Sequence, residues 1–483
     1  MAVNTPDGLS ERQTLKNIVL QGDTWGSILA SVQVDTIGQE CSKSGYGYEY
    51  KDVLPVGLLG LVDDTIGVTE VGYKAQMMNA FINVKTAEKG LQFGAKKCKT
   101  MLIGKKQETA LNSPLCVDNW SLEHVENHTE LVETYTGQVQ ISQTAEQKYL
   151  GFILSSAGDN MANIRALQNK SIGIIRKIFT KLHSLNLQQY YFEVGMTFMN
   201  VMLRSSILYA CETYYNLKET EIRQIERIEE SFMRQLIKTT KGCPINQIYL
   251  ELGQPPARYD IYKLRMFFLK YILDQEEEST IYKLFNLQLQ HPTKGDWAST
   301  TTNDMKHLNI NLSMDEIKKM SLNKFKSLVK VKCQEGAYNY LMNRRGSKGS
   351  EVIYPQVEMS EYFMPNNELS IEDRRKLFSI RNNMYQISSN FCSKKNNTSK
   401  CVCQETEDIE HIYICKKLNE EEAQVEYEKL FCGNMNELTY ILRRYEENLE
   451  KHEQFINEKN EETASHVILT DPLSSILLVN GNG

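Results

Sequence analysis

Two adjacent aspartates interrupt an apolar stretch of the sequence. Residues 57–62 lead into Asp63 and Asp64, after which apolar residues resume at Ile66 and Val68. This pattern predicts two strands joined by a tight turn that carries both carboxylates. Neighbouring carboxylates repel each other, so a bound cation would stabilise them; the alternative is an ordinary turn, in which aspartate is common. The first interpretation makes both aspartates candidate ligands of a divalent metal.

A second set of potential metal ligands lies near the C-terminal end of the sequence. It consists of three thiols and one imidazole, from Cys401, Cys403, His411 and Cys415. Structural zinc sites use four such ligands, although one residue between the first two cysteines is fewer than the usual two to four. A helix over 410–415 would place His411 and Cys415 one turn apart on one face. These residues predict a structural zinc box, with unrelated thiols and a surface histidine as the alternative.

Composition indicates a globular protein of several domains. The 483 residues are 41% hydrophobic and 24% charged, and the net charge is −6. That charge is unevenly distributed. Residues 161–270 hold 16 Lys and Arg against 9 Asp and Glu, whereas residues 401–483 hold 7 against 18. A basic middle region suits an anionic partner such as nucleic acid, and the acidic end does not.

The eleven cysteines are scattered singly through a long chain, which favours a reducing compartment over a disulfide framework. The first residues lack a basic segment followed by an apolar core, and the most apolar long stretch, 194–211, contains polar residues and an arginine. We therefore expect an intracellular protein, nuclear or cytoplasmic, that is not secreted and has no membrane span.

The elements that carry these residues are predicted from periodicity. Residues 73–89 are predicted to form an amphipathic helix whose core face contains Met77, Met78, Phe81, Ile82 and Val84. From residue 160 onward the spacing is helical. Apolar residues recur there every three or four positions and alternate with cations, including Arg165, Arg176, Lys177 and Lys181, and later Arg223, Arg227 and Arg234. These predict helices with basic outer faces, which either are solvated or bind phosphates.

Four short motifs occur in an order that resembles the later palm motifs of reverse transcriptases, most closely those of non-LTR (LINE-like) retrotransposons. They are Gln21-Gly22, Leu61-Val62-Asp63-Asp64, the Lys96-Lys97-Cys98-Lys99-Thr100 run after Gly90-Leu91, and Tyr149-Leu150-Gly151. The cysteine and histidine box resembles the one that follows the polymerase in those proteins. The usual proline after Gln-Gly is replaced here by Asp23-Thr24-Trp25.

The resemblance implies an RNA-directed DNA polymerase, a nucleotidyltransferase that uses Mg²⁺, an RNA template and a DNA primer or target. Asp63 and Asp64 would bind Mg²⁺, and Lys97 would lie near the nucleotide phosphates. Gln21 and Gly22 would position template and nucleotide. Tyr149, Leu150 and Gly151 would grip the primer. The cations Arg165, Arg176, Lys177 and Lys181 would bind nucleic acid from the thumb.

The expected fold is α+β and mostly α. Residues 1–159 would form a partial palm with the Asp-Asp hairpin and a primer-grip-like hairpin, and 160–290 a helical thumb-like domain. A helical connecting region (303–390), the zinc box (391–420) and an acidic tail (421–483) would follow.

One metal-binding aspartate of the family precedes the Gln-Gly turn, together with the fingers. Residues 1–20 contain no aromatic-flanked strand with an aspartate, and Asp7, Asp23 and Asp35 are poor replacements. We therefore expect the C-terminal part of a reverse transcriptase that is inactive alone. Two alternatives stay open: a non-catalytic RNA- or DNA-binding remnant, and a helical interaction protein with a structural zinc box. Whether the chain is an enzyme, and its oligomeric state, also stay open.

Overall fold

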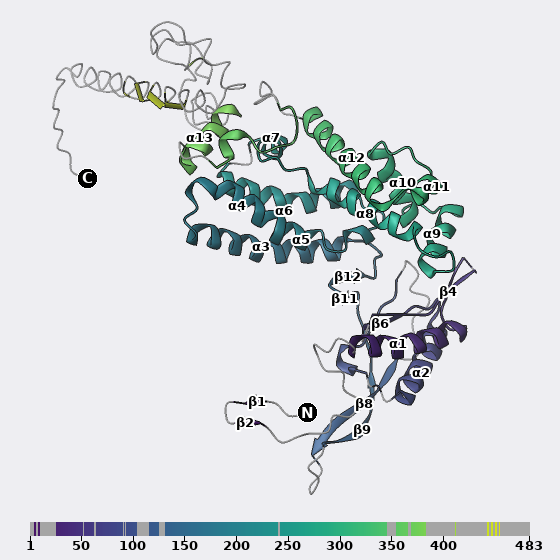
Figure 1. Cartoon of the computed structure of the whole chain (residues 1–483). Coiled ribbons are helices and arrows are strands. Elements are labelled where there is room, and N and C mark those ends of the chain that lie inside the picture. The colour runs from purple at the N-terminus through teal and green to yellow at the C-terminus, as the bar shows by residue number, and fades with distance from the viewer. Residues whose placement is uncertain are drawn as a thin grey trace, which may run out of the picture. The chain divides into compact units, whose positions relative to one another are not determined.

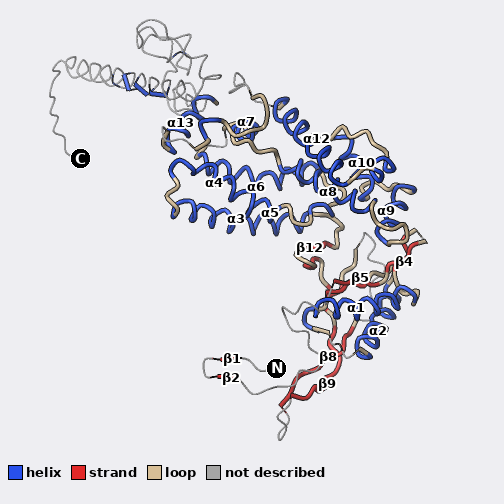
Figure 2. Tube along the Cα trace, viewed as in Figure 1, coloured by secondary structure: helices blue, strands red, loops and turns tan. Residues whose placement is uncertain are grey.

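The computed structural model describes residues 4–5, 8–9, 26–51, 53–61, 64–89, 91, 93–103, 115–124, 131–239, 242–344, 354–365 and 369–382, and eight residues further on (411, 442–443, 446–447, 450–451 and 454). This part of the chain is mostly helical, with several two-stranded sheets, which confirms the α+β, mostly α prediction (Figures 1 and 2). The chain divides into two compact units. Unit 1 comprises Met1–Asn169, Ala210–Ile222 and Leu264–Lys326; unit 2 comprises Lys170–Tyr209, Arg223–Lys263 and Ser327–Gly483.

Unit 1 contains all of the described strands. The antiparallel hairpins are β1 (Asn4–Thr5) with β2 (Gly8–Leu9), β3 (Tyr48–Tyr50) with β4 (Leu54–Val56), β5 (Leu58–Leu61) with β6 (Asp64–Gly67), β8 (Cys116–His124) with β9 (Leu131–Gln140), and β11 (Glu146–Tyr149) with β12 (Phe152–Ser155). The parallel pair is β7 (Lys99–Thr100) with β10 (Ser142–Gln143). Its helices are α1 (Gly26–Lys43), α2 (Gly72–Glu88), η1 (Ala95–Lys97), η5 (Cys211–Thr213), α9 (Thr280–Gln290), α10 (Trp297–His307) and α11 (Met314–Lys319).

Helix α1 packs closely against β5. The contact depends on Gly60, because a Cβ atom at this position would lie 2.9 Å from Cγ1 of Val34. Ile37 and Cys41 of α1 are buried. The strand that leads to the Asp-Asp turn is thereby supported along its length by a helix.

Helix α2 forms where the sequence predicts it, but with a different buried face. Met78 is buried and would be 2.9 Å from a Cβ atom at Gly67. The Asn79 and Asn83 amides donate to the backbone oxygen of Cys116, at 2.7 and 3.0 Å. Packing on β6 and bonding to β8 therefore orient the helix. The prediction that Met77 and Val84 lie in the core was wrong, because both are exposed.

Unit 2 is helical. Its own helices are η3 (Gln188–Tyr190), α4 (Tyr191–Phe198), the π-helix η4 (Met199–Arg204), α5 (Ser205–Ile207), α7 (Ile245–Glu251), η6 (Glu361–Phe363) and α13 (Ile371–Arg381). Four further helices have residues in both units: α3 (Met161–Ser184), α6 (Glu219–Ile237), α8 (Ala257–Leu273) and α12 (Leu322–Asn343).

Buried ion pairs hold the unit 2 helices together. Arg204 of η4 donates to Glu229 of α6 and to Asp260 of α8, both at 2.6 Å. Arg258 pairs with Glu226 at 2.6 Å. Buried charges are costly unless they are paired and hydrogen-bonded, so each pair restricts the helices to an arrangement in which both partners meet.

Residues 354–363 dock onto α7 through Glu251. The hydroxyls of Tyr354 and Ser360 and the guanidinium of Arg381 all donate to this buried carboxylate. Leu252 forms a β-bridge with Met359, and Gly253, with φ +63°, lies so close that a Cβ atom would be 2.1 Å from the Met359 nitrogen. Only glycine allows this approach.

Candidate functional site

The predicted hairpin at the Asp-Asp motif is present. Leu61 of β5 pairs with Asp64 of β6, and Val68 continues the ladder by donating to the Gly57 oxygen at 2.8 Å. Asp64 is the first residue of β6, and its side chain is exposed. Asp63 lies outside the described residues.

The Tyr-Leu-Gly motif also forms a hairpin. Tyr149 of β11 pairs with Phe152 of β12, and Leu150 and Gly151 form the turn. Both turn residues have positive φ angles, +46° and +86°, as in a type I′ turn. Glycine accepts this conformation readily, whereas Leu150 adopts it at some cost in backbone strain.

The two hairpins lie close to each other. Burial raises the pKa of the Tyr149 phenol, and the negative charge of Asp64 raises that pKa further. A carboxylate has this effect only when it is near the phenol, because charge interactions weaken with distance and solvent screening. Two motifs that are 85 positions apart in the sequence are therefore neighbours in unit 1.

The second hairpin is anchored to the first turns of α3. The Asn163 side chain accepts from the backbone nitrogen of Ile153 at 3.1 Å and donates to the Tyr214 hydroxyl at 2.9 Å. The Tyr214 ring packs on Phe152, with centroids 5.6 Å apart. Asn160 donates to the Tyr215 oxygen at 2.9 Å. The hairpin and the start of α3 thus form one connected assembly.

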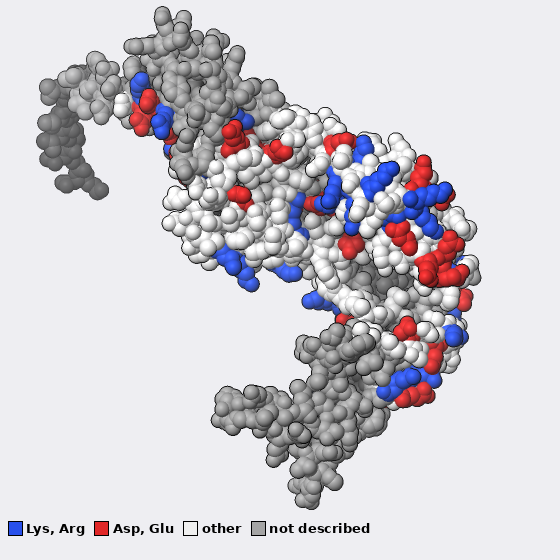
Figure 3. All heavy atoms as spheres, in the orientation of Figure 1, with Lys and Arg blue, Asp and Glu red and all other residues white. Residues whose placement is uncertain are grey.

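Helix α3 presents an exposed cationic face. Its 24 residues contain no acidic side chain, and Arg165, Arg176, Lys177 and Lys181 are all exposed, as predicted. Arg165 pairs with Glu146 at 3.0 Å. The other three form no ion pair with any residue that the structure describes. In the space-filling view, blue side chains follow the edge of the molecule where Figure 1 draws α3 (Figure 3).

The predicted basic face of α6 is largely neutralised. Arg223 pairs with Glu226 at 2.7 Å and with Glu230 at 2.8 Å. Arg234 donates to the Cys243 oxygen at 2.9 Å. Within unit 2, these two cations bind groups of their own chain and are therefore poor candidates for binding a phosphate. Of the cations predicted to form outer faces, Arg176, Lys177 and Lys181 of α3 and Arg227 of α6 are exposed and form no ion pair with a described residue.

Lys97 ends η1 and is exposed. Its backbone nitrogen donates to the Gly94 oxygen at 2.7 Å. Among the described residues, no hydrogen bond or ion pair joins the Lys97 side chain to Asp64 or Tyr149. The predicted role of Lys97 at the nucleotide phosphates stays a prediction.

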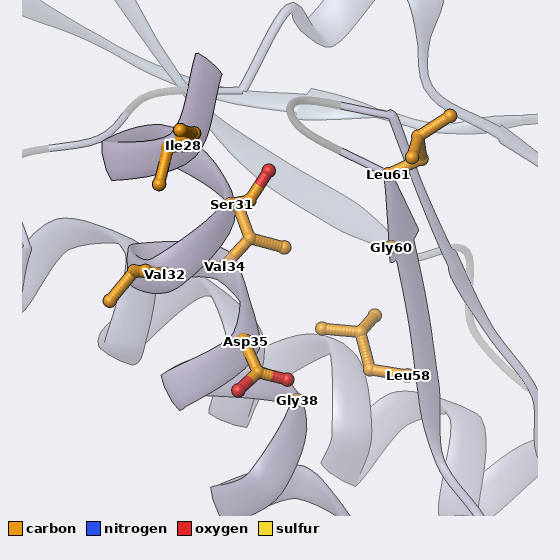
Figure 4. Close-up of a pocket in the computed structure, with 9 residues that line it drawn as sticks. All are labelled: Ile28, Ser31, Val32, Val34, Asp35, Gly38, Leu58, Gly60 and Leu61. Atoms are coloured by element: carbon orange, nitrogen blue, oxygen red, sulfur yellow. The ribbon is translucent and has the colours of Figure 1, made fainter. Parts of the chain in front are cut away.

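An open groove of about 580 Å³ lies between α1 and β5 (Figure 4). Its walls are mainly apolar, from Ile28, Val32, Val34, Leu58 and Leu61, with Ser31 and Asp35 as polar residues. Figure 4 shows Leu61, next to the Asp-Asp turn, at one end and Asp35 at the other. Asp35 accepts from Gln39 at 2.7 Å. Sequence reasoning missed this groove, because its walls come from segments that only folding brings together.

Five of the remaining predicted site residues lie outside the described residues: Gln21, Gly22, Cys401, Cys403 and Cys415. His411 is described: it is helical and buried. Among the residues that the structure places, no three His, Cys, Asp or Glu side chains converge as a metal would require.

Comparison of the sequence with profiles of known protein families and with curated proteins finds no match. Within the described ranges, every helix is too short or too polar to cross a membrane.

Proposed function

We propose that this chain carries the rear of the palm and the thumb of an RNA-directed DNA polymerase similar to those of non-LTR retrotransposons. The proximity of Asp64 to Tyr149 is the main support. A metal-binding turn and a primer-gripping hairpin must be neighbours for nucleotidyl transfer at a primer end. The next helix in the sequence carries exposed cations that form no ion pair with a described residue, and such cations suit a phosphate backbone.

The residues suit these roles chemically. Asp64 is exposed and pairs with no described cation, so its carboxylate is available to Mg²⁺ together with Asp63. Bound Mg²⁺ would supply charge stabilisation for phosphoryl transfer. The Tyr149 hairpin would hold the primer end beside this carboxylate. The α3 cations would bind phosphates without regard to sequence.

A second candidate function is non-catalytic RNA or DNA binding, because the α3 face needs no metal site to bind a backbone. Primer extension separates the two candidates. We expect the 483-residue polypeptide to bind a primer–template and, with Mg²⁺, to extend the primer by no detectable amount. The reason is that residues 1–20 offer no counterpart of the family's other metal-binding aspartate. Robust extension that Asp63→Ala abolishes would show that the metal site is complete.

The binding itself is tested by its salt dependence. Each neutralised phosphate releases counterions, so the double variant Lys177→Gln/Lys181→Gln should flatten the slope of log K against log salt by about 1.4 to 1.8. The matched control is Lys283→Gln/Lys318→Gln, because both lysines already pair with glutamates, Glu278 and Glu277. An unchanged slope in the first variant, or an equal change in the control, would rule out α3 as the phosphate-binding surface.

We also propose a structural zinc ion bound by Cys401, Cys403, His411 and Cys415. This rests on ligand type and number. Metal analysis of the reduced protein should find about one Zn²⁺ per chain, and Cys403→Ser should release it. If the purified protein contained no metal and were still fully stable, the proposed zinc site would be disproved.

A further inference from the structure

Helix α2 exposes an apolar stripe of regular spacing. From Gly72 to Ala87, the exposed residues are all apolar: Tyr73, Met77, Ala80, Val84 and Ala87. Their separations of four, three, four and three residues match the a and d positions of a coiled coil. We call these five residues the α2 seam. Tyr73, Met77 and Val84 are 65%, 48% and 56% exposed, so the seam is uncovered.

Three polar residues of α2 bind other elements of unit 1. Asn79 and Asn83 bond to the Cys116 oxygen, and Lys85 pairs with Glu40 of α1 at 3.1 Å. A surface helix normally turns its apolar stripe inward and its polar side chains to water. Here Asn79, Asn83 and Lys85 bind the helix to its own unit, and the apolar α2 seam faces outward. Exposed contiguous apolar surface of this kind marks an interaction site.

We propose that the α2 seam binds the α2 seam of a second copy of this chain, with the two helices antiparallel. The seam is self-complementary in that orientation. Tyr73 faces Ala87 of the second copy, Met77 faces Val84, and Ala80 faces itself on the two-fold axis. Tyr73, the largest side chain of the seam, thereby meets an alanine, and alanine at the centre lets the helices approach closely. An isologous contact of this form closes after two copies.

Charge complementarity favours the same partner and orientation. Lys74 follows Tyr73 and Glu88 follows Ala87, the two end residues of the seam. Both charged residues therefore flank the seam on the same side, at its opposite ends. In an antiparallel pair, Lys74 of each copy lies beside Glu88 of the other. Within one chain, Lys74 pairs with Glu70 and Glu88 with Lys85, both local surface pairs of small energy. These local pairs do not prevent exchange across the interface.

The expected dimer is modest in size. A helix of 17 residues is about 25 Å long, so the contact lies at the small end of specific interfaces, and association should depend on concentration. The proposal does not depend on the polymerase assignment, because it uses none of the residues in the candidate site.

Sedimentation velocity over a range of concentrations tests the surface. We expect a monomer–dimer equilibrium in which Val84→Glu raises the dissociation constant at least tenfold, because the seam would bury an unpaired charge. The control is Val53→Glu: Val53 lies in the β3–β4 turn and is 69% exposed, so the same substitution there should leave the equilibrium unchanged. A monomer at every concentration, or a dimer that Val84→Glu leaves intact, would overturn the proposal.

Charge reversal tests the orientation. Lys74→Glu alone and Glu88→Lys alone should each weaken the dimer, and the double variant should restore it, because opposite charges then meet again with their places exchanged. A double variant as weak as the single variants would refute the antiparallel arrangement.

Discussion

At the scale of single residues, the ionisation of Tyr149 reports the distance between two hairpins. Asp64 raises the pKa of Tyr149 because its negative charge disfavours the phenolate. Asp64→Asn should therefore lower the pKa of Tyr149, leaving the part of the shift that burial causes. Titration by NMR of tyrosine labelled at Cζ, with the signal assigned through Tyr149→Phe, measures the change.

Mg²⁺ should act in the same direction if it binds at Asp64, because a cation offsets the carboxylate charge. Glu70→Gln is the control, since the Glu70 carboxylate pairs with Lys74 instead. An unchanged Tyr149 pKa in Asp64→Asn would mean that the hairpins are apart, and the polymerase proposal would lose its main support.

Arg204 should contribute strongly to the stability of unit 2. Its guanidinium binds Glu229 through two nitrogens, at 2.6 and 3.1 Å, and Asp260 through a third. Arg204→Met would leave Glu229 fully buried without its cation, so we expect a loss of about 3–5 kcal/mol in the free energy of unfolding.

Urea denaturation followed by circular dichroism measures this loss. Arg176→Met removes the same group from an exposed site and should change the free energy of unfolding by no more than about 0.5 kcal/mol. Equal effects of the two substitutions would contradict the buried network.

The two arginines also show what sequence can predict about charge. Both occur in helical periodicity among apolar residues, and the sequence alone assigns neither to the interior. Arg223 was predicted on an outer face, yet it pairs with Glu226 and Glu230, three and seven positions further along the same helix. The partner of Arg234, the Cys243 oxygen, is set by the path of the chain after α6. The exposed face of α3 was predictable because that helix has no acids of its own to neutralise it.

At the scale of elements, the packing of α10 on α8 should depend on pH. Asp304 of α10 pairs with Arg265 of α8 inside unit 1. Burial raises the pKa of Asp304 to about 6, although Arg265 acts to lower it. The folded protein therefore binds this proton more tightly than the unfolded chain does. The stability contributed by Asp304 is fully present below its unfolded pKa, near 3.8, and is lost as the pH rises through 6.

Asp304→Asn removes this titration. We compare the free energy of unfolding of the unsubstituted protein with that of the variant. The difference, unsubstituted minus variant, should fall by about 2 kcal/mol between pH 4 and pH 7. Urea titrations at several pH values measure the difference. A constant difference over this range would show that Asp304 titrates alike in the folded and unfolded states.

Element prediction succeeded where local pattern decides the structure. The apolar runs on either side of the Asp-Asp pair predicted the hairpin at Asp64, and helical spacing predicted α2 and α3. The hairpin at Leu150–Gly151 was expected from the resemblance. The buried face of α2 was not predictable, because both of its faces carry apolar residues. The amides of Asn79 and Asn83, bound to β8, decide which face turns inward.

At the scale of the whole molecule, each unit is assembled from three separate stretches of sequence. Composition and periodicity follow the chain in order, so they predict consecutive domains. The return of residues 264–326 to unit 1 depends on pairings such as that of Trp297, which donates to the Glu212 oxygen at 2.8 Å. No local pattern in either segment indicates the other. The domain boundaries predicted from sequence stay predictions.

The buried ion pairs of unit 2 have a consequence for its response to heat. Pairs such as Arg204–Glu229 and Arg258–Glu226 lose hydration when they are buried. That loss becomes smaller on warming, because the hydration of charges carries a strongly negative entropy. The stabilisation from burying apolar surface increases little as the temperature rises. Unit 2 should therefore lose stability more slowly on heating than an equally stable unit whose core is entirely apolar, and the ion pairs should contribute least in the cold.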